Sequence, residues 1–172
     1  MRTLLLASIA AVAAASAASA QTPGSGYAGV GYTALDGEGA TLGAITLRGG
    51  FDFTEYFGAE GDLHIGVVDD TVTEMGTSVD LSADFGAAVY GVARLPLGDG
   101  MSNIFARAGY ATLEVEGSAM GVSVSAELDG FAYGVGGEFY FAGPNGVRLD
   151  YTRFDGDDGE LDAFGISYIR RF

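Results

Sequence analysis

The residues of this sequence that could carry out chemistry are ionisable groups spaced two positions apart. Glu60, Asp62 and His64 form the clearest set, and His64 is the single histidine of the chain. A histidine beside a carboxylate activates the nucleophile in a Ser-His-Asp triad. However, the sequence contains no Gly-x-Ser-x-Gly segment and no His/Cys cluster with metal-ligand spacing. We therefore predict that the protein is not an enzyme and that His64 is hydrogen-bonded inside a polar interior.

A second candidate for chemistry is the acidic run from Asp155 to Asp162. Carboxylate oxygens are the ligands that Ca²⁺ and Mg²⁺ prefer, and the candidates here are Asp155, Asp157 and Asp158. The run lacks the spacing of an EF-hand, and acidic runs are common on exposed loops. We interpret it as a solvated loop that could bind divalent cations weakly, and we expect neither a resident metal nor a cofactor.

Composition and charge exclude several classes of function. The formal net charge is −15, lysine is absent and the eight basic residues are all arginine, which disfavours nucleic-acid binding. Cysteine is also absent, so disulfides do not hold the fold together. The 29 glycines follow no collagen-like period and alternate with aromatic and β-branched residues, a composition typical of a sheet-rich barrel.

The first 20 residues have the features of a secretory signal peptide. An arginine at position 2 precedes an apolar run from Leu4 to Val12, and small residues lead to Ala20. We predict cleavage after Ala20 and one domain over residues 21–172. No uninterrupted apolar run in that domain is long enough for a membrane helix, so a membrane span would have to be a strand of a closed barrel.

The element that positions the ionisable residues is a β-strand, and the stretch from Val79 to Leu95 shows it best. Its odd-numbered positions carry no ionisable group, whereas Asp80, Asp84 and Arg94 lie at even-numbered positions. This period of two predicts a strand. The stretch exceeds the roughly 9–11 tilted residues that cross a bilayer.

Seven further segments repeat this alternation, over residues 26–35, 42–53, 57–67, 103–115, 122–139, 147–154 and 160–172. We expect an acidic loop from Asp69 to Thr77. In two segments the apolar phase changes, which predicts β-bulges near Ala111 or Thr112 and at Asp129-Gly130. The simplest fold is all-β, an eight-stranded antiparallel up-and-down transmembrane β-barrel.

The polar face of these strands combines charged residues with rows of glycine, which suits a cramped lumen better than an open surface. An eight-stranded barrel has an interior just wide enough for side chains to fill. We therefore predict a plugged lumen with a charge network of Arg48, Asp52, Glu60, Asp62, Asp84, Arg94, Arg107, Glu138, Arg148 and Asp150.

On these features the chain resembles the small eight-stranded outer-membrane barrels of Gram-negative bacteria, which include the outer-membrane protein A transmembrane domain, outer-membrane protein X and opacity-type proteins. The last strand carries the alternating residues of a signal that is similar to the family's assembly signal: Phe164, Ile166, Tyr168 and Phe172. Arg170 stands where the family usually has an aromatic residue. The resemblance implies the cell outer membrane, lipid and lipopolysaccharide surroundings, the barrel-assembly machinery as a partner, and a monomer.

We expect a structural or surface-interaction role for such a barrel. Two alternatives remain open from the sequence: a narrow porin-like channel, and a soluble periplasmic lipocalin-like carrier with its apolar face inside. Connections after alternate strands carry most of the carboxylates, so the two ends of the barrel face different surroundings. Divalent cations bridging these carboxylates to anionic lipopolysaccharide would be partners at that end.

Overall fold

The computed structural model describes residues 24–37, 40–68, 70–74, 77–98, 101–119, 122–156 and 159–172, so the predicted signal peptide lies outside the described residues. Nine strands account for almost all of this part of the chain: β1 (Ser25–Gly37), β2 (Ala40–Asp52), β3 (Phe57–Val68), β4 (Asp70–Glu74), β5 (Thr77–Leu97), β6 (Ser102–Ala119), β7 (Val122–Ala142), β8 (Asn145–Gly156) and β9 (Gly159–Arg171). No helix among the described residues is long and apolar enough to cross a membrane.

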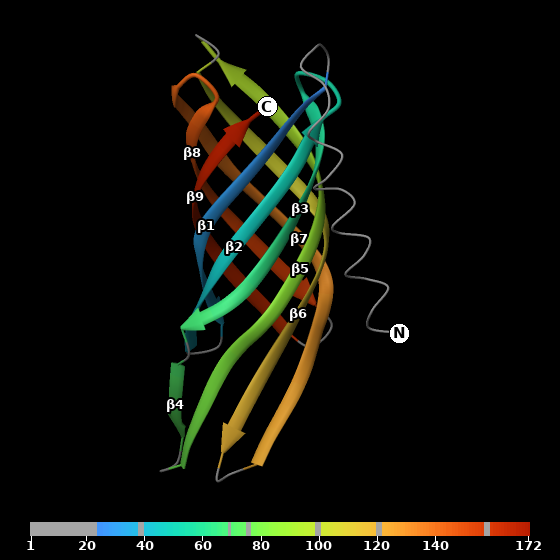
Figure 1. Cartoon of the computed structure of the whole chain (residues 1–172). Helices are drawn as coiled ribbons and strands as arrows, with labels where there is room; N and C mark the ends of the chain where they lie inside the picture. The colour runs from blue at the N-terminus through green and yellow to red at the C-terminus, as the bar shows by residue number, and fades with distance from the viewer. Residues whose placement is uncertain are drawn as a thin grey trace.

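The strands form one antiparallel sheet that closes on itself (Figure 1). The sheet order is β3-β2-β1-β9-β8-β7-β6-β5-β4, and an additional pairing of β3 with β5 closes the ring. β4 pairs with β5 beyond the end of β3, so β4 prolongs β3 and eight strands make the barrel. The predicted fold is therefore confirmed.

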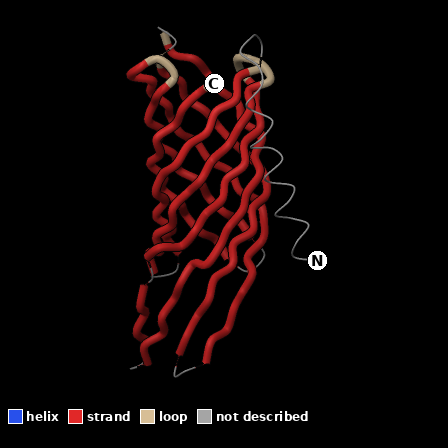
Figure 2. Tube along the Cα trace, in the orientation of Figure 1, coloured by secondary structure: helices blue, strands red, loops and turns tan. Residues whose placement is uncertain are grey.

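The segment predicted as a loop from Asp69 to Thr77 is not a loop throughout. Residues 70–74 form β4, which pairs with β5 from Asp70–Leu81 to Glu74–Thr77. Together with the long strands β5, β6 and β7, β4 extends past the ends of the other strands (Figures 1 and 2). We name the part of β4–β7 beyond the barrel, over residues 70–84, 115–119 and 122–128, the projecting sheet.

The two bulges predicted in β6 and β7 are absent, and this part of the prediction is wrong. The register of β6 with β7 runs without a shift from Ser102–Phe139 to Ala119–Val122. A shift occurs instead in the pairing of β5 with β6, between Ala83 and Phe85. The predicted alternation of the Val79–Leu95 stretch is consequently interrupted at Asp84 and is regular only from Phe85 onward.

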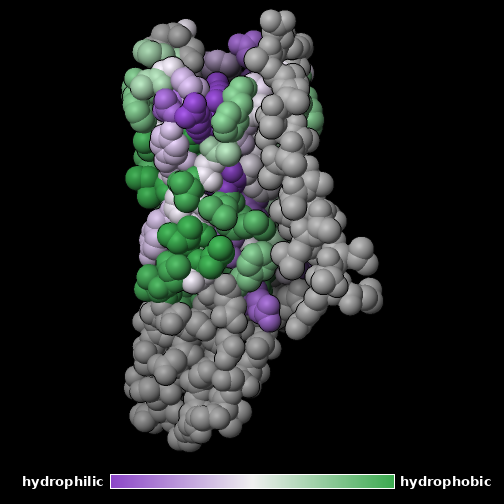
Figure 3. All heavy atoms as spheres, viewed as in Figure 1, coloured by the Kyte–Doolittle hydropathy of each residue, from purple (hydrophilic) through white to green (hydrophobic). Residues whose placement is uncertain are grey.

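The two faces of the barrel wall differ as the alternation predicted. Outward positions carry large apolar side chains that are exposed, including Val89 at 65% and Phe131 at 71% (Figure 3). Inward positions carry buried charged residues, with Arg148 at 0% and Asp62 at 1% exposure. A soluble barrel has the opposite arrangement, because its apolar residues form the core.

One end of the barrel has short turns, and we name it the turn end. Residues 53–56 reverse the chain there, as do the turns at Gly98 and Gly143, whose φ angles of 53° and 58° favour glycine. The first strand begins and the last strand ends at this end, where Phe172 N donates to Gly26 O at 2.8 Å. The opposite end carries the projecting sheet (Figure 2).

Candidate functional site

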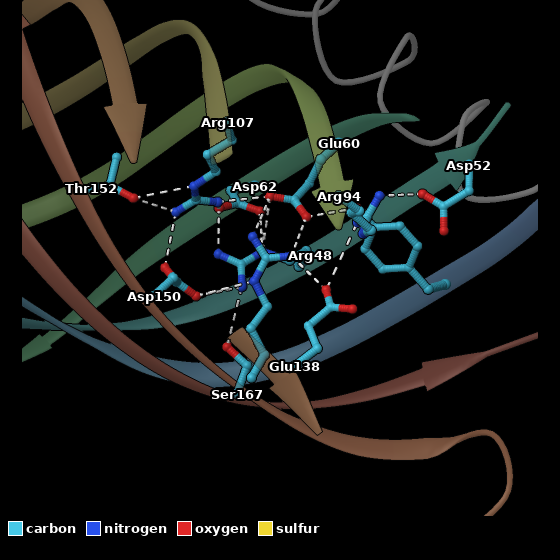
Figure 4. Close-up of polar contacts among 12 residues, drawn as sticks. Arg48, Asp52, Glu60, Asp62, Arg94, Arg107, Glu138, Asp150, Thr152 and Ser167 are labelled. Carbon is cyan, nitrogen blue, oxygen red and sulfur yellow. Dashed lines mark hydrogen bonds and ion pairs between the residues drawn. The ribbon is translucent and has the colours of Figure 1, made fainter. Parts of the chain in front are cut away.

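Six charged side chains from β2, β3, β6 and β8 fill the middle of the barrel (Figure 4). Strand alternation brings all of them to the inner face, and each is at most 9% exposed. We name them the central cluster: Arg48, Glu60, Asp62, Arg107, Arg148 and Asp150. Three guanidinium groups meet three carboxylates, so the cluster has no net formal charge.

Arg48 makes the most regular contact of the central cluster. The register of β2 with β3 places it directly opposite Asp62, and its Nε and Nη2 atoms donate to the two carboxylate oxygens of Asp62, each at 2.7 Å. Its remaining Nη1 donates to Asp150 Oδ1 at 2.9 Å. A guanidinium fork on a carboxylate is among the strongest and most directional side-chain contacts.

The other two arginines connect strands that are not neighbours in the sheet. Arg107 Nη1 donates to Glu60 Oε1 at 2.7 Å and to Asp62 Oδ2 at 2.8 Å, and its Nη2 donates to Asp150 Oδ2 at 2.9 Å. Arg148 donates to both oxygens of Glu60, at 2.6 and 2.9 Å. Each carboxylate is thus shared by at least two arginines, so the buried charges satisfy one another.

Aromatic rings and a hydroxyl complete the central cluster. The guanidinium of Arg107 lies 4.3 Å from the ring centre of Tyr90, and that of Arg148 lies 3.8 Å from the ring centre of Phe105. Both distances suit cation–π attraction. Thr152 Oγ1 accepts from Arg107 Nη2 at 2.6 Å. The sequence prediction did not include Tyr90, Phe105 and Thr152. Each lies an even number of positions from a predicted inward residue of its own strand, so the alternation could have identified it.

A second charged group lies nearer the turn end, and we name it the turn-end cluster: Tyr27, Asp52, Arg94, Glu138 and Arg171. Arg94 contacts Asp52 and donates to the hydroxyl of Tyr27 at 2.7 Å. Arg171 lies 3.4 Å from Glu138 and balances its charge. The Tyr27 hydroxyl in turn donates to Glu60 Oε2 at 2.7 Å, which joins the two clusters. Tyr27 and Arg171 were not among the predicted network residues.

His64 is buried on β3, on the other side of the central cluster. Its Nδ1 lies 2.9 Å from Thr46 Oγ1, which is 2.6 Å from Thr33 Oγ1. Its Nε2 has no hydrogen-bond partner among the described residues, and its ring is nearly perpendicular to the ring of Phe154, with the ring centres 6.5 Å apart. A triad requires a carboxylate hydrogen-bonded to one nitrogen and a nucleophile at the other. The described residues do not provide that arrangement around His64.

Beyond His64 the interior becomes apolar. Five buried residues form a layer across the lumen: Leu35, Leu42, Ala44, Leu113 and Ala163. Phe154 and Leu161 pack against them. We name this group the apolar layer. The lumen therefore contains, from the turn end, the turn-end cluster, the central cluster, the His64 site and the apolar layer.

The structure unites nine of the ten predicted network residues in the two charged clusters. The side chain of the tenth, Asp84, lies outside the described residues, as do Asp157 and Asp158. Asp155 is exposed at the end of β8. Among the described residues, no group of three or more His, Cys, Asp or Glu side chains is arranged to hold a metal ion.

The predicted assembly-signal residues lie on the outer face of β9 or, for Phe172, directly after its end. Phe164, Ile166, Tyr168 and Phe172 are between 43% and 58% exposed. Tyr168 donates to Asn145 Oδ1 at 2.5 Å, which fixes its ring against β8. The guanidinium of Arg170, on the same face, lies 6.0 Å from the ring centre of Phe172. These positions confirm the faces and leave recognition by the assembly machinery a prediction.

Comparison with known proteins agrees with this geometry. The family model of the outer membrane protein beta-barrel domain matches residues 3–172. The chain is similar in structure to Ail, the attachment invasion locus protein of Yersinia pestis, with a TM-score of 0.65 and 16% identity over 88% of this chain and 100% of that one. No curated protein sequence matches the chain.

Two further solved structures have the same fold. Ail in complex with the heparin analogue sucrose octasulfate has a TM-score of 0.63 and 17% identity, over 88% of this chain and 100% of that one. The outer membrane protein OprG from Pseudomonas aeruginosa has a TM-score of 0.61 and 9% identity, over 88% of this chain and 97% of that one. Identities this low indicate a shared fold and no more.

Proposed function

This chain belongs to the family of outer-membrane protein β-barrel domains, and from that premise we propose that it is a non-enzymatic barrel with a plugged lumen and a structural or surface-interaction role. The family places it in the Gram-negative outer membrane, surrounded by lipid and lipopolysaccharide. The soluble periplasmic carrier considered from the sequence is therefore wrong. We further propose that a cleaved signal peptide precedes the barrel and that the barrel is a monomer, inserted by the assembly machinery.

The observation that carries the plugged lumen is the contact of Arg148 with Glu60. β8 and β3 are four strands apart in either direction around the eight-stranded ring, yet these side chains meet at 2.6 Å. Opposite walls are therefore joined directly through a neutral cluster. The apolar layer lies further along the same lumen, towards the opposite end. An ion crossing the lumen would have to separate buried ion pairs and then enter an apolar constriction, and both steps are unfavourable.

Conductance in planar bilayers tests this proposal. We expect the refolded protein to insert without steady single-channel currents, in a preparation where a large porin conducts under the same conditions. Insertion is verified separately by the difference in gel mobility before and after boiling. Steady conductance by the folded, unmodified protein would overturn the plugged lumen and favour the narrow porin-like channel.

The surface role concerns the end with the projecting sheet. Outer-membrane barrels have short periplasmic turns and longer extracellular loops, so we assign the turn end to the periplasm and the projecting sheet to the cell exterior. Of the 23 acidic residues, five belong to the two lumen clusters and Glu55 and Asp99 to the turns. By their position in the sequence, the remaining 16 fall in or beside the connections opposite the turns, where the sequence has one arginine, Arg153.

This charge sets the chemistry of the surface that we propose. Ail was solved with a sulfated heparin analogue, which is a polyanion. The acidic exterior end of the present chain would repel such a ligand, so we do not extend heparin binding to it. Divalent cations or cationic partners fit this end instead. Failure to bind a heparin column at low salt, where electrostatic attraction is strongest, is the expected result.

A further inference from the structure

Arg170 lies on the outer face of β9, close to the turn end, and its side chain is exposed. Six other arginines among the described residues each form an ion pair with a carboxylate: Arg48, Arg94, Arg107, Arg148, Arg153 and Arg171. The side chain of Arg170 forms no ion pair and no hydrogen bond with any residue that the structure describes. Its positive charge therefore lacks a partner there, in a chain whose formal net charge is −15.

The neighbours of Arg170 on the wall offer it no anion. The strand registers place it between Ala28 of β1 and Asn145 of β8. The amide of Asn145 is already occupied, because its Nδ2 donates to a backbone oxygen at 2.9 Å and its Oδ1 accepts from the Tyr168 hydroxyl at 2.5 Å. The ring centre of Phe172 lies 6.0 Å from the guanidinium. The surroundings thus supply aromatic and apolar surface, and the counter-charge has to come from outside the chain.

The position of Arg170 along β9 places it at the edge of the lipid. Eight residues along the strand lead from Asp162 to Arg170. At about 3.3 Å per residue and a tilt of about 35–45°, they span roughly 20 Å along the barrel axis, less than an apolar band about 25 Å tall. The two charged positions therefore cannot both lie outside the band. Asp162 is balanced, since the Tyr151 hydroxyl donates to it at 2.7 Å and Arg153 lies 3.3 Å away. Arg170 is not.

The chemistry of a guanidinium at this edge indicates its ligand. An unpaired charge in lipid is unfavourable, and a long arginine side chain extends towards the headgroups while its stem stays in apolar surroundings. The planar guanidinium matches the oxygens of a phosphate, and aromatic rings such as those of Tyr168 and Phe172 are favoured at headgroup level. A lipid with a net negative charge balances the arginine better than a zwitterionic one, whose own ammonium group offsets its phosphate.

We propose that Arg170 binds the phosphate of an anionic phospholipid in the periplasmic leaflet, beside the ring of Phe172. The inference rests on the proposed assignment of the turn end to the periplasm, and it adds one specific lipid contact to the proposed surroundings of the barrel. Arg170 stands where the family usually has an aromatic residue, so the contact is a property of this chain.

The test uses the refolded mature barrel in a non-ionic detergent with added lipid, and native mass spectrometry counts the lipids that stay bound. The probe is phosphatidylglycerol with two oleoyl chains. Two comparison lipids carry the same chains: phosphatidylcholine, which is zwitterionic, and diacylglycerol, which has no phosphate. We expect one phosphatidylglycerol to bind per barrel in a saturable manner, at least about fivefold tighter than phosphatidylcholine and about tenfold tighter than diacylglycerol.

Matched variants locate the contact. Arg170→Gln removes the unpaired charge, whereas Arg153→Gln removes an arginine on the outer face of the neighbouring strand β8 that is already paired. We expect the first to weaken phosphatidylglycerol binding about fivefold or more and the second to leave it within about twofold. Arg170→Phe supplies the aromatic residue usual in the family and should weaken binding as much as Arg170→Gln. Heat-dependent gel mobility verifies that each variant folds.

Several outcomes would overturn the inference. Equal binding of diacylglycerol would mean that the acyl chains alone act, and equal binding of phosphatidylcholine would mean that the net charge of the lipid does not matter. Displacement of the lipid by millimolar inorganic phosphate would mean that the site takes free phosphate. Equal effects of Arg170→Gln and Arg153→Gln, or full binding by Arg170→Phe, would place the contact elsewhere. These results in a silent barrel reject this inference alone, whereas steady conductance rejects the plugged lumen.

Discussion

The guanidinium of Arg107 on β6 lies 4.3 Å from the ring centre of Tyr90 on the adjacent strand β5. The same guanidinium contacts carboxylates from β3 and β8 on other sides of the lumen. The ring of Tyr90 thus limits where the guanidinium of Arg107 can lie. The carboxylates that this guanidinium joins come from strands that are not adjacent to β6. Arg107 is consequently a central link of the plugged interior.

We expect Arg107→Ala to lower the free energy of unfolding by about 3–5 kcal/mol, because it leaves an excess of buried carboxylate. Arg153→Ala is the matched control. Arg153 pairs with Glu160 and Asp162 on the outer face with 31% of its side chain exposed, so its loss should change the free energy of unfolding far less than the loss of Arg107. The chain has no tryptophan, so urea unfolding in lipid vesicles is followed by gel mobility. Equal losses for both variants would contradict a tightly paired interior.

The apolar outer band predicts a dependence on depth. Val135 lies midway along the barrel portion of β7 and is 57% exposed, so Val135→Arg should destabilise the barrel in lipid by about 2–4 kcal/mol. Leu95, at 55%, lies near the turn end of β5, and Leu95→Arg should cost only about 0–1 kcal/mol. Equilibrium refolding into vesicles measures both. A larger cost at Leu95 would mean that the membrane band is placed wrongly.

Close strand packing leaves no room for a side chain at Gly109 on β6. A methyl group added at Gly109 on β6 would overlap the backbone oxygen of Val89 on β5, whereas one added at Gly49 on the outer face of β2 would meet no atom within 4 Å. We expect Gly109→Ala to destabilise the barrel by about 1–3 kcal/mol, as overpacking does. Gly49→Ala should be close to neutral. The urea midpoints of the two variants in the same lipid decide this, and similar midpoints would contradict the packing described.

Calcium should stabilise the exterior end. Clustered carboxylates repel one another unless hard cations bridge them, and a ligand that binds only the folded state raises its stability. We expect millimolar Ca²⁺ to raise the melting temperature of the refolded barrel at constant ionic strength. Replacing Asp155, Asp157 and Asp158 together by Asn should reduce that rise. An unchanged melting temperature across the titration would mean that the carboxylates of this end are solvated and do not bind Ca²⁺.

Alternation in the sequence was sufficient to predict the membrane-facing and lumen-facing sides of the wall. A strand turns successive residues to opposite faces, and lipid and lumen demand opposite polarity, so the sequence alone separates Val89 from Tyr90 or Leu149 from Arg148. The same reasoning predicted nine of the charged residues that meet in the lumen. These properties are local, because each depends on one strand and its two surroundings.

Only the tertiary structure decided which charges pair and where the pattern changes. The contact of Arg148 with Glu60 depends on barrel diameter and on the register of strands far apart in the chain, and no local pattern contains either quantity. The phase change after Ala111 predicts a bulge only if apolar residues face outward along the whole strand. In the structure the backbone is regular and Leu113 faces inward, because the strand passes from lipid into water and the polarity of its two faces reverses there.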